Sequence, residues 1–294
     1  PIRLSLGGSE MCLRDRCLYV RLGVLCAHLD NIKNFVSLDK VEFVDHKEIF
    51  LKLCEKAAAI IENMRAGVME RLGLGFETIS GRNQLIVYAC VRGFGDPRTG
   101  ESPYAHWPSL DAAAQSFGGL VYANDGLVTP AIADIFPGTL AAFGLVSAIH
   151  ESKTSGKGQF QHVSMYDAIF AIQKSALSQY SITAKPNPSG LQRAMTLYPF
   201  DLFPAKDGQV SIAVGQPHHW DLLCAAMDRG DMINDDRSAT NNSRLKNVEW
   251  VEEQICAWTS QLTRAEIMAK LDGSLPAGPV QNMSDIFRDD HVAA

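Results

Sequence analysis

The sequence lacks the short motifs that mark most nucleotide-binding and hydrolytic enzymes. Neither Gly73-Leu74-Gly75 nor Gly93-Phe94-Gly95 is followed by a third glycine at the spacing of a dinucleotide-binding turn. The segment Gly156-Lys157-Gly158 is preceded by Glu151 where a phosphate-binding loop needs glycine. A GxSxG serine-hydrolase elbow and an HExxH zinc motif are also absent. These absences argue against dinucleotide-dependent, P-loop, serine-hydrolase and zinc-protease chemistry.

Paired cysteines are lacking too. The count of seven is odd, the spacing is irregular, and no CxxC pair occurs. This pattern predicts reduced thiols in a cytosol-like compartment, with no disulfide framework and no zinc site. The cysteines are Cys12, Cys17, Cys26, Cys54, Cys90, Cys224 and Cys256.

Basic charge and long apolar runs are also scarce. The net charge of −6 gives no sign of a surface for nucleic acid or for acidic membranes. The longest nearly apolar run, Ile135 to Ile149, is interrupted by Pro137 and is shorter than the roughly twenty residues of a membrane span. The first thirty residues lack a basic region followed by an apolar one. We therefore expect neither a membrane span nor a signal peptide.

The first two thirds of the sequence predict strands that alternate with helices. "AAIIEN" and "QLIVYACVRGFG" are typical of buried strands, and Gln159 to Met165 predicts a third. A helix is expected from about Asp134 to Ser152, and further helices flank the strands. The alternation predicts an α/β fold: an open, Rossmann-like, mostly parallel sheet with helices on both faces.

A second, smaller unit follows the linker-like stretch "TAKPNPSG". A hairpin is expected around Asp207-Gly208, and three helical patterns come after it, which predicts an α+β domain. The predicted organisation is 1–30 unassigned, 31–190 a large α/β domain, and 196–294 a small α+β domain.

Four segments, in this order, resemble the family III CoA-transferases, the formyl-CoA transferase and carnitine dehydratase-like family. They are "IIENMRAGVMERLGLGFETI", "LIVYACVRGFG", "ADIFPGTLAAFGLVSAIHESKTSGKGQFQHVSMYDAI" and "DLFPAKDGQVSIAVG". The likeness covers roughly residues 31–294, because "PAGPVQNMSDIF" fits as well. Members usually open with a CoA-holding strand and turn and continue past "DDHVAA", so the chain looks shortened at both ends.

The resemblance implies that Asp134, in "ADIFPG", is a nucleophile that attacks an acyl-CoA thioester. An aspartate just ahead of a helix is kept ionised by the positive end of the helix dipole, and small neighbours leave room for a thioester. Without the resemblance, the pattern alone favours a helix N-cap at this residue. Asp167 is the competing nucleophile, but it lies within a helical pattern and is more typical of a cap or surface group.

The resemblance also places CoA contacts in "ENMRAGVMERLG". Asn63 matches a CoA-contacting asparagine, and Met64 stands where the family usually has phenylalanine. Arg71, followed by Leu72, matches an arginine near the nucleotide phosphates, for which a guanidinium is well suited. The alternative for Arg71 is a solvated helix arginine.

Leu110 and Asp111 are expected near the substrate. Asp111 matches an acidic residue near the active site of both transferases and racemases, and Leu110 stands where racemases carry a histidine. Because racemisation needs two acid–base groups, this leucine argues against a racemase; His106 is a weak substitute.

The expected activity is transfer of CoA between an acyl-CoA and a carboxylic acid. "GFGDPRTGESPYAHWPSLDAAAQSFGG" is similar to the branch that acts on C4–C5 dicarboxylic acyl groups. Arg92, Arg98 and His106 are candidates for a second carboxylate, although surface exposure is the expected role of each. The alternatives are a shortened member that only binds CoA or a partner chain, and an acyl-CoA racemase. The resemblance implies a homodimer of intertwined chains that uses CoA and no metal, and the cysteine pattern predicts a cytoplasmic location.

Overall fold

The computed structural model describes residues 43–186 and 196–293, which form two compact units, one on each side of the gap. The unassigned segment 1–30 lies outside the described residues. The predicted domain ranges, 31–190 and 196–294, stay a prediction, and each unit is described here by itself.

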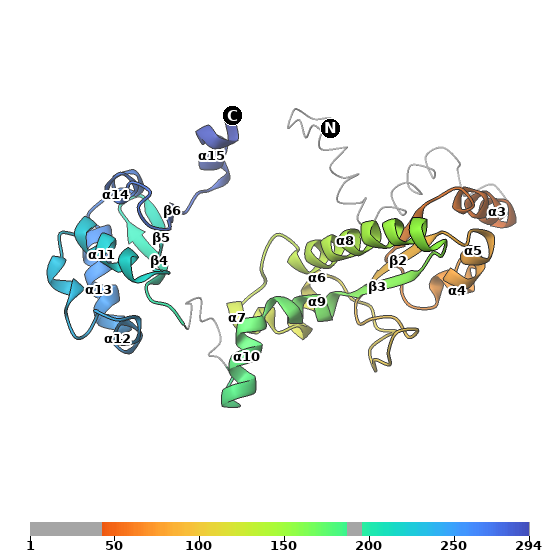
Figure 1. Ribbon diagram of the computed structural model, residues 1–294, viewed down its shortest axis with the longest axis horizontal. Coiled ribbons are helices and arrows are strands. Elements are labelled where there is room, and N and C mark those ends of the chain that lie inside the picture. The colour runs from red at the N-terminus through yellow and green to blue at the C-terminus, as the bar shows by residue number, and fades with distance from the viewer. Residues whose placement is uncertain (1–42, 187–195, 294) are drawn as a thin grey trace. The chain divides into compact units, whose positions relative to one another are not determined.

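A three-stranded parallel sheet forms the centre of the first unit (Figure 1). Its strands are β1 (Ala59–Glu62), β2 (Val87–Arg92) and β3 (Phe160–Ser164), in that spatial order. Ile60 pairs with Tyr88, and Cys90 with His162. Strand β2 is central, and its first four residues are fully buried, as its continuous apolar run requires.

Helices cover both faces of this sheet. On one face, α3 (Phe43–Cys54) and α5 (Phe76–Arg82) pack onto Ile60, Tyr88 and Cys90. On the other face, α6 (Asp111–Phe117), α8 (Ile132–Ser155) and α9 (Met165–Ile172) enclose a second apolar cluster that contacts Val91. Side chains of a strand alternate between the two faces of the sheet, so Cys90 and Val91 pack into apolar clusters on opposite faces. The α/β prediction is confirmed.

The remaining helices described in the first unit are α4 (Val68–Arg71), α7 (Leu120–Asn124) and α10 (Lys174–Thr183).

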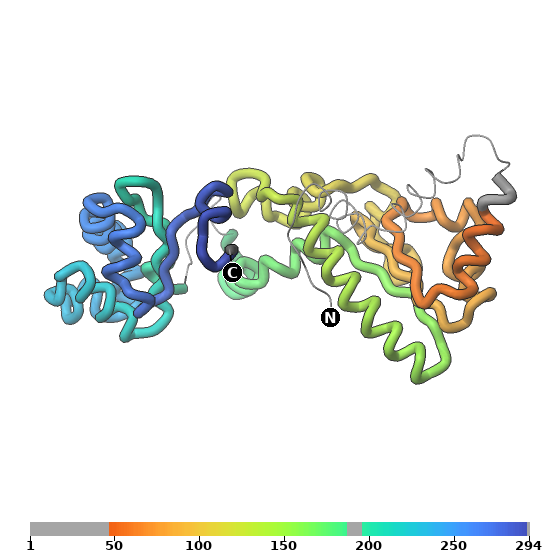
Figure 2. Tube along the Cα trace, turned by 90° about the horizontal axis from the view of Figure 1, so that it is seen from above, coloured from red at the N-terminus to blue at the C-terminus, as the bar shows by residue number. Residues whose placement is uncertain are grey.

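Helix α8 packs closely on the sheet because one of its faces carries small residues. Ala133, Pro137, Ala141, Ala148 and Ser152 are buried and fall on one helical stripe. The helix runs beside β3 in both views (Figures 1 and 2). Within the described residues, α8 is the one helix long and apolar enough to cross a membrane, by length and composition alone. That no membrane is involved stays a prediction.

The second unit is built on an antiparallel sheet of β4 (Phe200–Ala205), β5 (Gly208–Ala213) and β6 (Ala277–Pro279). The predicted hairpin is confirmed, since Ala205 pairs with Gly208 across its turn. A core around the fully buried Trp220 joins this sheet to the helices. The helices are α11 (Pro217–Ala226), α12 (Asn241–Lys246), α13 (Val248–Thr259), α14 (Arg264–Leu271), α15 (Met283–Ile286), α16 (Asp290–Ala293) and the 3₁₀ helix η1 (Gly230–Ile233).

Glycine at position 67 is required by the backbone between β1 and α4. Gly67 has φ of 81° and starts α4, a conformation that costs an L-residue about 1 kcal/mol. Gly81, in α5, has helical backbone and open space around its missing Cβ.

We therefore expect Gly67→Ala to lower the free energy of unfolding by about 1 kcal/mol. The matched control, Gly81→Ala, is expected to raise it by roughly 0.5 kcal/mol, because alanine is the better helix former. Urea unfolding followed by circular dichroism measures both. Equal effects of the two substitutions would contradict the backbone assigned to Gly67.

Candidate active site

A pocket opens where the three parallel strands of the first unit end. It has a volume of about 470 Å³, which suits a small-molecule site. Asn63 follows β1, Gly93 follows β2 and Met165 follows β3, and all three line it. The carboxyl edge of a parallel sheet is the usual place for a ligand in this class of fold.

The rest of the wall comes from loops and from the start of α8. Among the described residues, the lining consists of Asn63, Met64, Arg65, Ala66, Val91, Arg92, Gly93, Ala105, Trp107, Ser109, Leu110, Ala131, Asp134, Ile135, Gly138 and Met165. Most of these side chains are apolar or small. Asp134 is the only acidic residue among them, so a carboxylate faces an otherwise largely apolar cavity.

Asp134 is the third residue of α8, one turn into the helix. The residue at the N-cap position is Ala131, so Asp134 is not the N-cap that the competing interpretation required. Asp134 is partly exposed, and its carboxyl group makes no hydrogen bond or ion pair with any residue that the structure describes. A carboxylate that neither caps a helix nor pairs with a described cation remains available to a ligand in the pocket.

The pKa of Asp134 is raised above its usual value, first by partial burial and then by the negative charge of Asp111. This differs from the expectation that the helix end favours the anion. Burial is the larger cause of the raised pKa, and Asp111, whose Oδ1 accepts the backbone N–H of Ala133 at 2.8 Å, is the second. Asp111 thus accepts a hydrogen bond from one of the first backbone N–H groups of α8, and it places a second negative charge beside Asp134.

Asp111 also belongs to a small polar network that fixes the loop ahead of α8. Its Oδ2 accepts a hydrogen bond from Nε2 of the fully buried Gln115 at 2.8 Å. Gln115 in turn bonds both the carbonyl and the N–H of Val128, each at 2.9 Å. Asp111 does not line the pocket, whereas its neighbour Leu110 does and is 78% exposed.

The predicted CoA contacts divide into two pairs. Asn63 and Met64 line the pocket together with Asp134. Arg71 and Leu72 do not: the exposed Arg71 ends α4, and Leu72 is its C-cap. The structure therefore brings the first pair, but not the second, into one cavity with the candidate nucleophile.

The lining residues that were not predicted include Arg65, Trp107, Ser109 and Met165. Arg65 was within reach of sequence analysis, because it directly follows Asn63-Met64. Ser109 lies so close to Gly93 that a Cβ on this glycine would approach the serine Cβ to 2.2 Å. Such a contact between distant loops leaves no signal in local sequence patterns.

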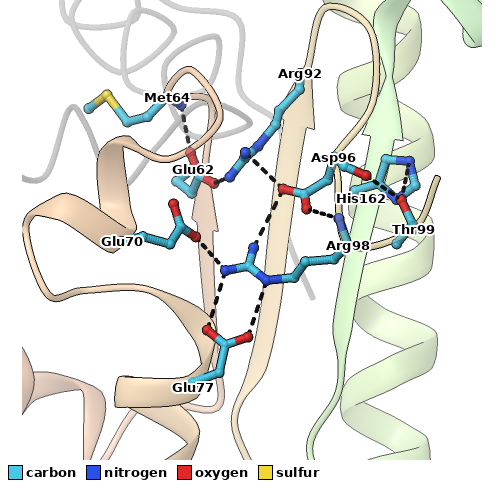
Figure 3. A network of polar contacts seen from close by, with 9 residues as sticks. All are labelled: Glu62, Met64, Glu70, Glu77, Arg92, Asp96, Arg98, Thr99 and His162. Carbon is cyan, nitrogen blue, oxygen red and sulfur yellow. Dashed lines mark hydrogen bonds and ion pairs between the residues drawn. The ribbon is translucent and has the colours of Figure 1, made fainter. Parts of the chain in front are cut away.

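The expectation of surface exposure was wrong for Arg92. Its side chain is 3% exposed and forms ion pairs with Glu62 and Asp96, each at 2.8 Å (Figure 3). Arg98 is 24% exposed and also pairs with carboxylates. His106 is exposed and lies outside the pocket, in a neighbouring shallow depression. Among the described residues, no three histidine, cysteine or acidic side chains are grouped as a metal site would need.

These features define an α/β protein with a small-molecule site at the carboxyl edge of its parallel sheet. The chain belongs to CoA-transferase family III, whose model matches residues 28–294.

Several named CoA-transferases have sequences similar to this one. It is 37% identical over 254 residues to a succinyl-CoA:mesaconate CoA-transferase of Haloarcula hispanica, covering 84% of this chain and 64% of the relative. It is 30% identical to an acetyl-CoA:oxalate CoA-transferase of Acetobacter aceti, and the alignment covers 84% of this chain and 65% of that relative. A succinate–glutarate CoA-transferase of Agrobacterium fabrum is 28% identical, with 83% and 62% covered. The chain thus spans just under two thirds of the length of these relatives.

A solved structure has the same fold. The crystal structure of a CAIB/BAIF family protein from Brucella suis aligns with a TM-score of 0.71 at 25% identity, covering 86% of this chain and 68% of that one.

Replacing Asp111 by asparagine is expected to lower the pKa of Asp134, because the second cause of its upward shift is removed while burial remains. Carbon-13 NMR titration of the labelled aspartate carboxyls measures the change. The control is Asp167→Asn, which alters an exposed first-turn aspartate of α9 that does not line the pocket. An unchanged Asp134 titration in the Asp111 variant would contradict the assigned coupling.

Proposed function

We propose that this chain carries the active site of a CoA-transferase, with Asp134 as the nucleophile. The observation that supports this most is the partly exposed carboxylate of Asp134, which pairs with none of the described residues and shares one pocket with Asn63 and Met64. Membership of CoA-transferase family III and the names of the relatives support the same activity.

The proposed reaction exchanges one thioester for another in four steps. A carboxylate oxygen of Asp134 attacks the acyl carbonyl carbon, the C–S bond breaks, and CoA leaves as a thiolate with a mixed anhydride left behind. The thiolate attacks the aspartyl carbonyl, which gives an aspartyl-CoA thioester and frees the donor acid. The acceptor carboxylate displaces CoA again to form a second anhydride. The thiolate finally attacks the acceptor acyl carbon, which regenerates Asp134.

The pocket residues have distinct proposed roles. Asn63 and Met64 hold CoA near its thioester, and the small side chains at Ala131 and Gly138 leave room for the tetrahedral centre beside Asp134. Arg71 and Leu72 lie outside the pocket, so we assign them to a more distant part of CoA, with Arg71 at a phosphate. Leu110 contributes apolar surface, and Asp111 positions the first turn of α8 through Ala133.

The proposed substrates are C4–C5 dicarboxylic acids and their CoA thioesters. Relatives named for succinyl-CoA, mesaconate and glutarate support this class. Because Arg92 and Arg98 already pair with protein carboxylates, we do not assign the second carboxylate of the substrate to either of them.

Two alternatives predict different results. A chain that only binds CoA or a partner would show binding without covalent modification. An acyl-CoA racemase would bring solvent deuterium to the α-carbon, but Leu110 is not an acid or base, and His106 lies outside the pocket.

We also propose a cytoplasmic homodimer of intertwined chains. Support comes from the face of α8 opposite the sheet, where Phe143 is 77% and Val146 is 68% exposed. On α10, Ile182 is 84% exposed. Large apolar side chains in such number on one unit are typical of an interaction surface.

Incubation with succinyl-CoA or mesaconyl-CoA is expected to acylate Asp134. Trapping with hydroxylamine or borohydride and peptide mass spectrometry locate the modified residue. Asp134→Asn should abolish the adduct and lower transferase activity by at least roughly a thousandfold, since covalent catalysis is lost.

The control Asp167→Asn should react as the wild type does. An adduct on another residue, or full activity in Asp134→Asn, would contradict the proposed nucleophile. CoA binding without any adduct would favour the binding-only alternative.

Phe143→Glu is expected to shift the chain from dimer to monomer, because it places a charge in an apolar interface. Sedimentation velocity at several concentrations measures the oligomeric state. Lys52→Glu, at an exposed position of α3 on the other face of the sheet, is the control. A wild-type monomer, or a dimer unaffected by Phe143→Glu, would contradict this interface.

A further inference from the structure

A buried ion pair joins the ends of two neighbouring strands at the pocket. Glu62 is the last residue of β1, and Arg92 is the last residue of β2. Nη2 of Arg92 lies 2.8 Å from Oε1 of Glu62, and both side chains are only 3% exposed. The residue that follows each of them, Asn63 or Gly93, lines the pocket, and so does Arg92 itself.

The second oxygen of Glu62 holds the loop that follows it. Oε2 accepts the backbone N–H of Met64 at 2.6 Å, so the Glu62 side chain folds back over its own loop (Figure 3). This loop supplies four consecutive lining residues, 63–66. One carboxylate therefore links the position of the loop to that of β2.

Arg92 extends the network to the loop after β2. Its Nη1 lies 2.8 Å from Oδ2 of Asp96, whose side chain is 1% exposed. Oδ1 of Asp96 accepts the backbone N–H of Arg98 at 2.9 Å. The Arg98 guanidinium pairs with Glu70 of α4 and with Glu77 of α5 (Figure 3). The network thus reaches from both strand ends to two helices.

Stability alone does not account for these buried charges. Removing two ions from water costs as much as their attraction returns, and well-packed apolar residues often stabilise a core at least as well. What an ion pair with fixed hydrogen bonds adds is geometry, because each partner accepts only a few orientations.

We propose that Glu62, Arg92 and Asp96 are positioning residues for acyl-CoA. They hold the 63–66 loop in the conformation that binds CoA, and so set the affinity for CoA rather than the reactivity of Asp134. The inference rests on the proposed function, since it takes CoA as the ligand of this loop.

Glu62→Gln tests this role with almost no change in size. Glutamine offers one acceptor oxygen and one NH₂ donor, while Arg92 and the Met64 N–H both donate, so one of the two contacts must be lost. We expect the Kd of CoA to rise on the order of tenfold. We also expect faster hydrogen exchange at the Met64 amide, and Asp134 acylation at saturating acyl-CoA within about twofold of the wild type.

Two substitutions at Arg92 separate charge from packing. Arg92→Lys keeps a positive charge beside Glu62 and should recover part of the affinity that Arg92→Met loses. The matched control is Arg82→Met, which breaks the exposed pair of Arg82 with Glu48 at 2.7 Å and leaves the pocket untouched. It should leave the Kd of CoA and the Met64 exchange rate unchanged.

The possible outcomes distinguish failure of the positioning role from failure of the proposed function. Glu62→Gln with wild-type CoA affinity and unchanged Met64 exchange overturns the positioning role, even if thermal stability falls. A wild-type chain that fails to bind CoA in calorimetry contradicts the proposed function and the ligand assigned to the loop. Met64 exchange, which needs no ligand, still reports whether Glu62 holds the loop.

Discussion

The buried pair of Glu62 and Arg92 is the interaction on which the geometry of the site depends. It lies where β1 and β2 leave the sheet, and the next residue of each chain segment, Asn63 or Gly93, lines the pocket. Parallel strands already bring these ends to one edge of the sheet. The ion pair adds a fixed distance between them, and the bond from Met64 to Glu62 carries that constraint into the loop.

The opposite side of the pocket has its own anchor. Asp111, in α6, accepts a hydrogen bond from the N–H of Ala133 in the first turn of α8. Gln115, also in α6, bonds to Asp111 and to the loop that precedes α8. Asp134 therefore projects from a fixed helix terminus without having to cap it. The charge of Asp111 and partial burial raise the pKa of Asp134, so the site holds a carboxylate that its own surroundings stabilise poorly. Such a group is suited to react with a ligand.

The sequence was a reliable guide wherever periodicity and local chemistry determine the structure. The three strands, the hairpin at Asp207 and the long helix α8 follow from apolar patterns and turn residues, and the family was identified from motifs. Helices α5 and α7 were not predicted, since they are short and lack strong caps. Arg92 was misjudged, because its burial depends on Glu62, thirty residues away, and on Asp96. Pairing of this kind exists only in the folded chain.

The central claim is that acyl transfer passes through the carboxyl group of Asp134. It is tested most directly by turnover with an acceptor acid labelled with ¹⁸O in its carboxylate. In the proposed sequence, the bridging oxygen of the second anhydride stays on the aspartate when CoA takes the acceptor acyl group. The account predicts that ¹⁸O appears in the peptide that contains Asp134. Conversion of the labelled acceptor with no label in that peptide would contradict it.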